Sequence, residues 1–470
     1  KVVFAPWQQA TWDSNDTVLL IDPKTDLDVG EFFRRLPEQD YLPTWYSRSK
    51  TSAIASEKDA AQKASAHANT PAIAHLDTLG RTFLTIADNG GVNQYETRIT
   101  LDIEGNTILV TDARNNEVMV YAIAEKDAQG KSQIIGRAFD LLGHNLYSHS
   151  MDAGDRWILN NVAGQPIRAW NNRETRYDVP ESPRGYRFRT VYDALQRPTH
   201  LYVQPAGEPE ILVERLVYGE THPQAQQRNL KGKPFQHYDG AGVVSNWEFD
   251  FKGNLLRGSR QLAREYKQPV NWMMLANLTE IAQVGQAAIA LLERKTFDTF
   301  TTFDALNRPI SLTTPDQSII YPILNEANLL EKVEVKLRGA TTRSTFVSNI
   351  NYDAKGQREF IEYGNGVKTE YRYDPQTFRL IQLLTTRIDK NQPTRLQNLN
   401  YTYDPVGNIT TIRDDSQQTN YFNGEVVSPS TQYQYDALYR LISASGREHI
   451  GQTTQQPPET RSDLKPHYDA

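Results

Sequence analysis

The chain has 470 residues, a net charge of −6, and 57 acidic against 51 basic residues, with no basic block along its length. This charge balance argues against a surface that binds nucleic acid or an anionic membrane. The sequence also contains no run of about 18 apolar residues, the length needed to span a bilayer. Cysteine is absent, which excludes disulfides, cysteine–zinc sites and a cysteine nucleophile. Aromatic residues make up 10% of the chain, a content that disfavours disorder.

The first 75 residues do not match the pattern that follows them. Residues 1–75 are therefore interpreted as an irregular lead-in segment that joins an upstream domain. Within it, residues 51–68, "TSAIASEKDAAQKASAHA", are rich in Ala, Lys, Glu and Gln and predict a helix. Pro71 follows shortly afterwards as a stop signal.

A short word recurs along the rest of the chain, as in "YDALQRPTHL", "FDALNRPISL", "YDAKGQREFI", "YDPVGNITTI" and "YDALYRLISA". It consists of an aromatic residue or Leu, Asp, two variable residues, commonly Gly or Asn, often Arg or Asn, and an apolar-rich run. In the last third the copies stand roughly 20 to 32 residues apart, which predicts one hairpin or strand pair per copy. The aspartates of the word are Asp77, Asp102, Asp140, Asp193, Asp250, Asp304, Asp353, Asp374, Asp404 and Asp436, and Asn325 begins an eroded copy.

Each position of the word has a physical role in a turn. Asp accepts a hydrogen bond from the backbone two residues on, and Gly356 or Gly407 adopts a positive φ at low cost. Asn307 tolerates this backbone conformation, whereas Gln196 and Tyr439 are expected to adopt it less readily. The residues assigned to structural repeat turns are Tyr192, Asp193, Phe249, Asp250, Gly253, Phe303, Asp304, Asn307, Tyr352, Asp353, Gly356, Tyr373, Asp374, Tyr403, Asp404, Gly407, Tyr435 and Asp436.

One segment interrupts the β pattern. Apolar residues recur at helical spacing across 271–295, which predicts a helical insertion that packs on the sheet or plugs an opening. The expected organisation is thus a first part of the repeat sheet at 76–267, an insertion at 268–298 and a second part at 299–470, the whole being part of a longer chain.

Three groups of residues were weighed as functional sites. Asp22, Asp26 and Asp28 could offer oxygen ligands to calcium, but their spacing matches no EF-hand and a solvated turn is the simpler explanation. His144, His149, Asp152 and Asp155 could form a zinc site, and Asp152 with Asp239 could form a pair of catalytic carboxylates. A structural role is an equally simple explanation for each of these groups. No metal site and no cofactor are therefore expected.

The non-repeat words are more distinctive than the repeats. "ATWDSNDTVLLIDP", "FFRRLPEQDYLPTWY", "LVERLVYGETHP", "DFKGNLLRGSRQL" and "DALYRLISASGREHIGQ" stand beside the repeated "YDALNRP"-like words. In this combination the chain resembles RHS-repeat, or YD-repeat, proteins. It is similar to the RHS-containing C-terminal part of SpvB-related bacterial proteins and to the B component of Tc insecticidal toxin complexes.

The resemblance implies a mainly β fold: a long antiparallel YD-repeat sheet of stacked hairpins that spirals into a hollow shell, with short helical insertions near 51–68 and 271–295. The shell would hold a toxin domain and would be completed by a C-type RHS subunit or a downstream RHS core. Upstream domains would contact a pore-forming A-type component. The protein would be secreted by a bacterium, with cytoplasmic assembly before export left open, and this part would carry no catalysis.

Two other hypotheses remain open from the residues alone. Rows of exposed Tyr and Trp could make the chain a secreted adhesion or carbohydrate-binding repeat protein. Alternatively, an enzyme site could be assembled from scattered loops, and convergent residues with perturbed pKa values would support that hypothesis.

Overall fold

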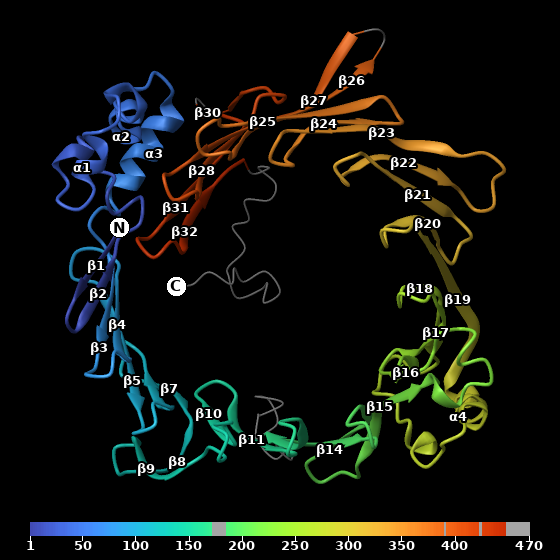
Figure 1. Cartoon of the computed structure of the whole chain (residues 1–470). Helices are drawn as coiled ribbons and strands as arrows, with labels where there is room; N and C mark the ends of the chain where they lie inside the picture. The colour runs from blue at the N-terminus through green and yellow to red at the C-terminus, as the bar shows by residue number, and fades with distance from the viewer. Residues whose placement is uncertain (172–184, 390–391, 423–424, 448–470) are drawn as a thin grey trace. The chain divides into compact units, whose positions relative to one another are not determined.

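The computed structural model describes residues 1–171, 185–389, 392–422 and 425–447. The fold is mainly β, and the antiparallel repeat sheet expected from the sequence is confirmed: 28 strands belong to one hydrogen-bonded sheet. Two compact units are present, unit 1 with residues 1–99 and 349–470 and unit 2 with residues 100–348. In each unit, neighbouring strands of the sheet are mostly consecutive in the chain (Figure 1), apart from the hairpin at 122–137 and the strands at 420–422 and 425–427, which form separate two-stranded sheets.

Unit 2 is an antiparallel meander with one helical insertion. Its strands are β6 (Thr107–Thr111), β7 (Glu117–Val120), β8 (Ala122–Lys126), β9 (Ser132–Arg137), β10 (Tyr147–Ser150), β11 (Gly154–Asn160), β12 (Pro166–Asn171), β13 (Tyr186–Tyr192), β14 (Pro198–Pro205), β15 (Ile211–Tyr218), β16 (Pro234–Asp239), β17 (Gly242–Phe249), β18 (Leu255–Ala263), β19 (Leu292–Phe303), β20 (Pro309–Thr313), β21 (Ile319–Leu324) and β22 (Leu330–Lys336). Its helical elements are the 3-10 turns η3 (Gly219–Thr221), η4 (Met273–Leu275) and η5 (Ile289–Leu291) and helix α4 (Ile281–Ala288).

Unit 1 combines both ends of the chain. From the N-terminal side come β1 (Val2–Ala5), β2 (Gln8–Thr11), η1 (Pro23–Thr25), α1 (Gly30–Phe33), η2 (Glu38–Asp40), α2 (Trp45–Thr51), α3 (Ala55–Ser65), β3 (Ala72–Leu76) and β4 (Thr82–Asp88). From the other side come β24 (Arg358–Tyr363), β25 (Val367–Tyr373), β26 (Leu380–Asp389), β27 (Gln392–Tyr403), β28 (Ile409–Asp414), β29 (Asn420–Phe422), β30 (Glu425–Val427), β31 (Ser430–Tyr435) and β32 (Leu441–Ser445). Strands β5 (Gln94–Leu101) and β23 (Ser344–Tyr352) carry the chain between the units.

The repeat words occupy one edge of the sheet in each unit. Because consecutive strands are antiparallel, their connections alternate between the two edges. The YD turns fall at every second connection. In unit 2 this edge carries the turns that begin at Asp102, Asn161, Asp193, Asp250, Asp304 and Asn325, and in unit 1 those at Asp353, Asp374, Asp404 and Asp436. We call this edge of each unit the YD edge.

Helices form where they were expected, with narrower limits. The predicted helix at 51–68 is α3, and α2 precedes it. The helical insertion predicted at 271–295 is present but is broken into short elements, because Asn277 and Thr279, both poor helix formers, separate η4 from α4, and β19 begins at Leu292. The lead-in segment is also less irregular than expected, since β1, β2 and β3 pair with one another as part of the sheet.

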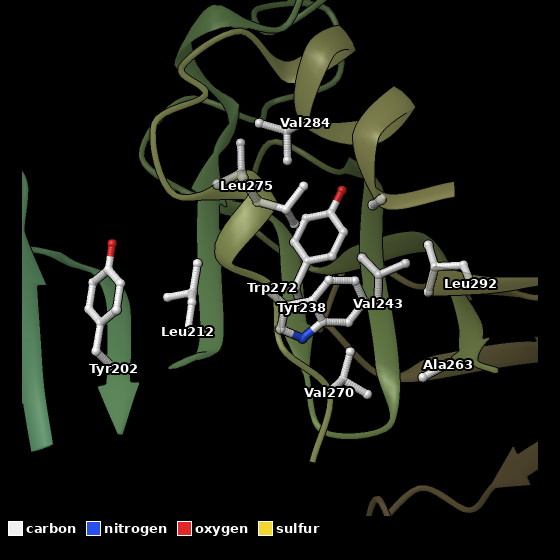
Figure 2. Packing of buried hydrophobic residues seen from close by; sticks show 12 residues of the cluster. Tyr202, Leu212, Tyr238, Val243, Ala263, Val270, Trp272, Leu275, Val284 and Leu292 are labelled. Carbon is white, nitrogen blue, oxygen red and sulfur yellow. The ribbon is translucent and has the colours of Figure 1, made fainter. Parts of the chain in front are cut away.

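The insertion after β18 packs on the sheet through one aromatic anchor. Trp272 is fully buried, and its ring meets that of Tyr238 edge-on at 5.2 Å between centroids (Figure 2). Its indole N–H donates to the carbonyl of Asp239 at 3.0 Å. The surrounding buried side chains are Leu212, Val217, Val243, Val270, Leu275, Val284 and Leu292. Apolar burial of this kind, about 25 cal/mol per Å², holds the insertion in place.

Two basic side chains, one neutral and one charged, lie beneath the insertion. His200 Nε2 donates to the carbonyl of Ala276 at 3.1 Å, and the Arg215 guanidinium donates to the carbonyl of Leu278 at 3.2 Å. Arg215 is buried, and burial lowers its pKa. Burial also lowers the pKa of His200 to about 4, so the imidazole is neutral when the insertion is docked.

This burial predicts an acid-sensitive fold. The pKa of His200 is about 4 in the folded chain but 6.5 when exposed, so below neutral pH the unfolded chain binds more protons. Stability should therefore fall as the pH is lowered from about 7 toward 4. We expect the thermal midpoint to fall less over this range in His200→Gln than in the wild type and in the control His75→Gln. Equal dependence in all three proteins would contradict this account.

Candidate functional site

The candidate site is a repeated one: the hairpin turn that begins at each motif Asp. In the turn at Asp193, the Asp193 N–H donates to the carbonyl of Arg197 at 3.0 Å, and the Gln196 N–H donates back to the carbonyl of Asp193 at 2.9 Å. Carboxylate Oδ1 accepts the N–H groups of Leu195 and Arg197, both at 2.9 Å. Oδ2 accepts Nε of Arg197 at 2.7 Å. One carboxylate therefore accepts hydrogen bonds from two backbone N–H groups and one side chain of the same turn.

The same network recurs with a small set of alternatives at the fourth residue after Asp. Arg fills this position in some turns, Asn in others and His in one, and each side chain donates to Oδ2. The full network is present at Asp77, Asp102, Asp140, Asp193, Asp250, Asp304 and Asp436. Asp353 accepts the two backbone N–H groups, and Asp374 belongs to a turn one residue longer.

These hydrogen bonds favour the charged carboxylate. The Arg81 N–H lowers the pKa of Asp77, the Asn106 amide lowers that of Asp102, and the Arg308 N–H lowers that of Asp304. A carboxylate held in this way accepts hydrogen bonds and does not act as a proton donor at neutral pH. These three aspartates thus have the charge state of structural acceptors.

The third residue after Asp has a left-handed backbone in these turns, except in the longer turn at Asp374, where the fourth residue, Phe378, has it. Gly356 and Gly407 take φ values of 79° and 119°, and Asn307 takes 63°. Gln196 and Tyr439, which were expected to adopt this conformation less readily, do so at 60° and 62°. The ladder register shifts beside the motif aromatic in most of these hairpins, as a type I turn with a bulge requires.

A tyrosine at the end of a strand ties several of the hairpins to the preceding one. It is the last residue of its strand, and its hydroxyl donates to the carbonyl of the first residue of the neighbouring return strand. The pairs are Tyr192 to Pro166, Tyr218 to Pro198, Tyr373 to Arg358, Tyr403 to Leu380 and Tyr435 to Ile409, at 2.7–3.1 Å. Burial raises the pKa of Tyr403 and Tyr435, so both hydroxyls remain protonated donors.

Side chains also connect neighbouring turns along the YD edge. Asn254 Nδ2 donates to Asn307 Oδ1 at 3.0 Å, and Gln357 Nε2 donates to the Phe378 carbonyl at 2.9 Å. Further links of this kind run from Asn161 and Gln165 to Gln196, from Arg308 to Asn328, and from Arg379 to the carbonyls of Asp404 and Pro405. The edge is therefore a hydrogen-bonded ladder of turns.

In unit 1 the lead-in segment binds two of these turns directly. Asn15 is completely buried and donates from Nδ2 to Asp404 Oδ2 at 3.0 Å. The Tyr439 hydroxyl donates to the Asp13 carboxylate. His67 Nε2 donates to the Tyr435 carbonyl at 3.0 Å. These contacts join residues more than 360 positions apart, and we call the set the clasp.

Helix α3 supports the clasp on the neighbouring strands (Figure 1). Its buried face consists of Ala60, Ala61 and Ala64, which are no more than 1% exposed and permit close approach to β27 and β28. Ser56 and Thr402 share a hydrogen bond of 3.0 Å across this contact. The alanine-rich sequence that predicted the helix thus also explains its close packing.

Several turns of the same type were missed in the sequence. Asp112, Asp127 and Asn161 accept the same pair of backbone N–H groups. None of them follows an aromatic residue or Leu, which is why a motif that begins with such a residue did not include them. A pattern of Asp or Asn followed three residues later by Gly or Asn would have found all three.

The weak metal candidates lie close together but have local partners. Asp22 accepts the Lys24 N–H, and Asp26 accepts the N–H groups of Asp28 and Val29. Lys1 forms ion pairs with Asp26 and Asp28 at 3.3 and 2.7 Å. In the described part of the chain, no three His, Cys, Asp or Glu residues are arranged to hold a metal ion.

The remaining candidate zinc ligands and catalytic carboxylates do not form a common site either. His144 pairs with the Asp of its own turn, Asp140, and His149 pairs with Asp155, each at 2.8 Å. Asp239 is held by the Arg260 guanidinium at 2.6 and 2.8 Å. Each of these three carboxylates is thus engaged by a histidine or arginine side chain.

The clasp makes Asp404 the most sensitive motif residue. Asp404 is 3% exposed and accepts hydrogen bonds from Gly407, Asn408 and Asn15, so Asp404→Ala leaves several buried donors unsatisfied. We expect a loss of about 2–4 kcal/mol of unfolding free energy in urea titrations. The control Asp353→Ala removes a carboxylate from an uncovered turn and should cost about 1 kcal/mol. Equal losses would argue against the clasp.

Replacing an L residue that has a left-handed backbone in such a turn should stabilise the fold. Gln317 is exposed and has a φ of 67° in the turn after β20. Gln317→Gly should raise the unfolding free energy by about 0.5–1 kcal/mol, because L residues are disfavoured in this conformation. The reverse change, Gly80→Ala, meets no atom within 4 Å and should destabilise through backbone strain alone. Thermal unfolding of both variants measures the effect, and changes of the same sign would contradict it.

No protein-family model matches the chain. Among curated proteins it is 31% identical over 341 residues to toxin subunit YenC2 of Yersinia entomophaga and 29% identical over 328 residues to toxin subunit YenC1 of the same organism. These matches cover 70% and 68% of the chain but 34% and 31% of the relatives. The chain thus spans about a third of the length of the curated relatives it matches.

Solved structures extend the likeness to nearly the whole chain. A chain of the TcdB2-TccC3 crystal structure matches 97% of it, with a TM-score of 0.72 and 26% identity, and the match covers 19% of that chain. The Tc holotoxin pore of Photorhabdus luminescens matches 95%, with a TM-score of 0.72 and 26% identity, over 18% of its chain. The chain is an RHS-repeat, or YD-repeat, protein that resembles the subunits of Tc toxin complexes.

Proposed function

We propose that this chain is a structural wall segment of a hollow YD-repeat shell, which encloses and protects a toxin cargo in a bacterial Tc-like toxin complex. The proposal assigns no catalysis to these residues. Its main support is the turn ladder, in which tyrosine hydroxyls and edge side chains tie many neighbouring hairpins together. Each repeat then stabilises its neighbour, as a continuous wall requires.

The aspartates provide a second line of support. Motif carboxylates are spaced along the YD edge, and each is engaged by donors of its own turn, so they do not gather around a reacting centre. A cavity of about 490 Å³ lies beside β20 and β21 and includes Asp304 and Arg308. Both side chains are already bonded to each other within their turn, which argues against a catalytic role.

The comparisons favour this role over adhesion. The matched proteins are named as toxin subunits and as Tc complexes, and a chain of the TcdB2-TccC3 complex has the same fold. By analogy, the proposed partners are an RHS subunit or RHS core that completes the shell, the enclosed toxin domain, and a pore-forming component reached through other domains. The protein would act after secretion from the bacterium. Among the described residues no helix is suited to cross a membrane.

Protection of cargo from protease tests the proposal. In the full-length protein assembled with its RHS partner and cargo, the cargo should be digested far more slowly than the free toxin domain. Asn15→Ala removes the buried clasp donor and should speed digestion about tenfold, the effect of about 1.4 kcal/mol on an opening equilibrium. Asn93→Ala, an exposed control, should have no effect. Equal digestion of assembled and free cargo would overturn the function.

A further inference from the structure

The tips of the YD turns carry apolar residues that face outward. In unit 2 the first or second residue after the motif Asp or Asn is large and apolar in most turns of the YD edge. These side chains are 69% to 100% exposed: Ile103, Val162, Leu195, Phe251 and Leu306. A repeated row of this kind is unusual, because single exposed apolar residues are normally scattered.

Unit 1 shows the same turn in a covered state. The words "YDALYR" at 435–440 and "YDALQR" at 192–197 are nearly identical, yet Ala437 is 9% exposed and Leu438 is half-buried, whereas Leu195 is 69% exposed. The difference comes from the clasp, in which the lead-in segment lies on the turns at Asp404 and Asp436. The tip residues are thus suited to burial by a second polypeptide segment.

The covering segment has a definite chemistry. At the clasp it supplies the carboxylate of Asp13, the amide of Asn15, and apolar side chains that line a cavity of about 360 Å³ with Pro405. On the YD edge of unit 2, a cavity of about 300 Å³ beside Phe251 is lined by Lys231, Lys233 and Lys252. Such an edge is complementary to a segment that carries carboxylates between apolar residues.

We propose that the YD edge of unit 2 is the seam at which a second YD-repeat segment of the shell docks. The occupant is an RHS segment of the completing partner, which presents acidic and apolar residues as the lead-in segment does at the clasp. This inference rests on the proposed function. The tip residues lie at an edge of the sheet and not on either face. They are therefore better placed to contact a neighbouring segment of the shell than the enclosed cargo.

Site-specific labelling tests the seam without disturbing the fold. The chain contains no cysteine, so Leu195→Cys and Leu306→Cys each introduce one reactive thiol at the seam. Leu337→Cys is the matched control, because Leu337 is also exposed but follows β22 at the opposite edge. Maleimide labelling rates are measured in the full-length protein alone and in its assembly with the RHS partner, with and without cargo.

We expect both seam thiols to label at least tenfold more slowly in the assembly, with or without cargo, while the control is unchanged. Equal rates at the seam in the free and assembled protein would overturn the proposal. Protection that appears only with cargo would make cargo the occupant, and protection in the free protein that grows with concentration would make it a second copy; either result overturns the proposal. Protease protection of cargo is read separately, so an unprotected seam around a protected cargo would reject the seam and leave the shell function standing.

Discussion

The fold depends on one interaction: an aspartate carboxylate that accepts two backbone N–H groups of its own turn and often the side chain four residues on. A free hairpin turn leaves these groups to water, whereas here a single charged acceptor holds them and sets the left-handed residue that closes the bulge. Repetition places these turns at one edge of the sheet in each unit. The remaining contacts follow from that placement, since the motif tyrosine then lies beside the preceding return strand.

The sheet is held together by many modest contacts and only local apolar clusters. Tyrosine hydroxyls and edge amides each contribute on the order of 1 kcal/mol, and their sum grows with the number of hairpins. The described buried clusters lie mainly under the helical insertion, around Trp272 and Tyr238. This distribution explains a low apolar fraction together with a high tyrosine content. It also fits a sheet that is exposed to solvent on both faces.

Local features were predictable from the sequence, and long-range ones were not. The aspartate turns and helix α3 follow from residue type and spacing over a few positions, and both can be read directly from the sequence. Turns at Asp112 and Asn161 were missed because the motif required an aromatic residue or Leu before Asp. The clasp could not be foreseen, because nothing in "WDSND" near residue 15 indicates a partner almost 400 residues away. By contrast, the break within 271–295 lies at Asn277 and Thr279, whose low helix propensity is a local signal.

The central claim is that these turns are the corners of a wall that encloses space. An electron cryomicroscopy map of the full-length protein assembled with its RHS partner and cargo tests it most directly. The account predicts a wall one sheet thick, with the motif aspartates along strip edges and cargo density inside. A solid particle without an internal space, or motif aspartates gathered around one centre, would contradict it.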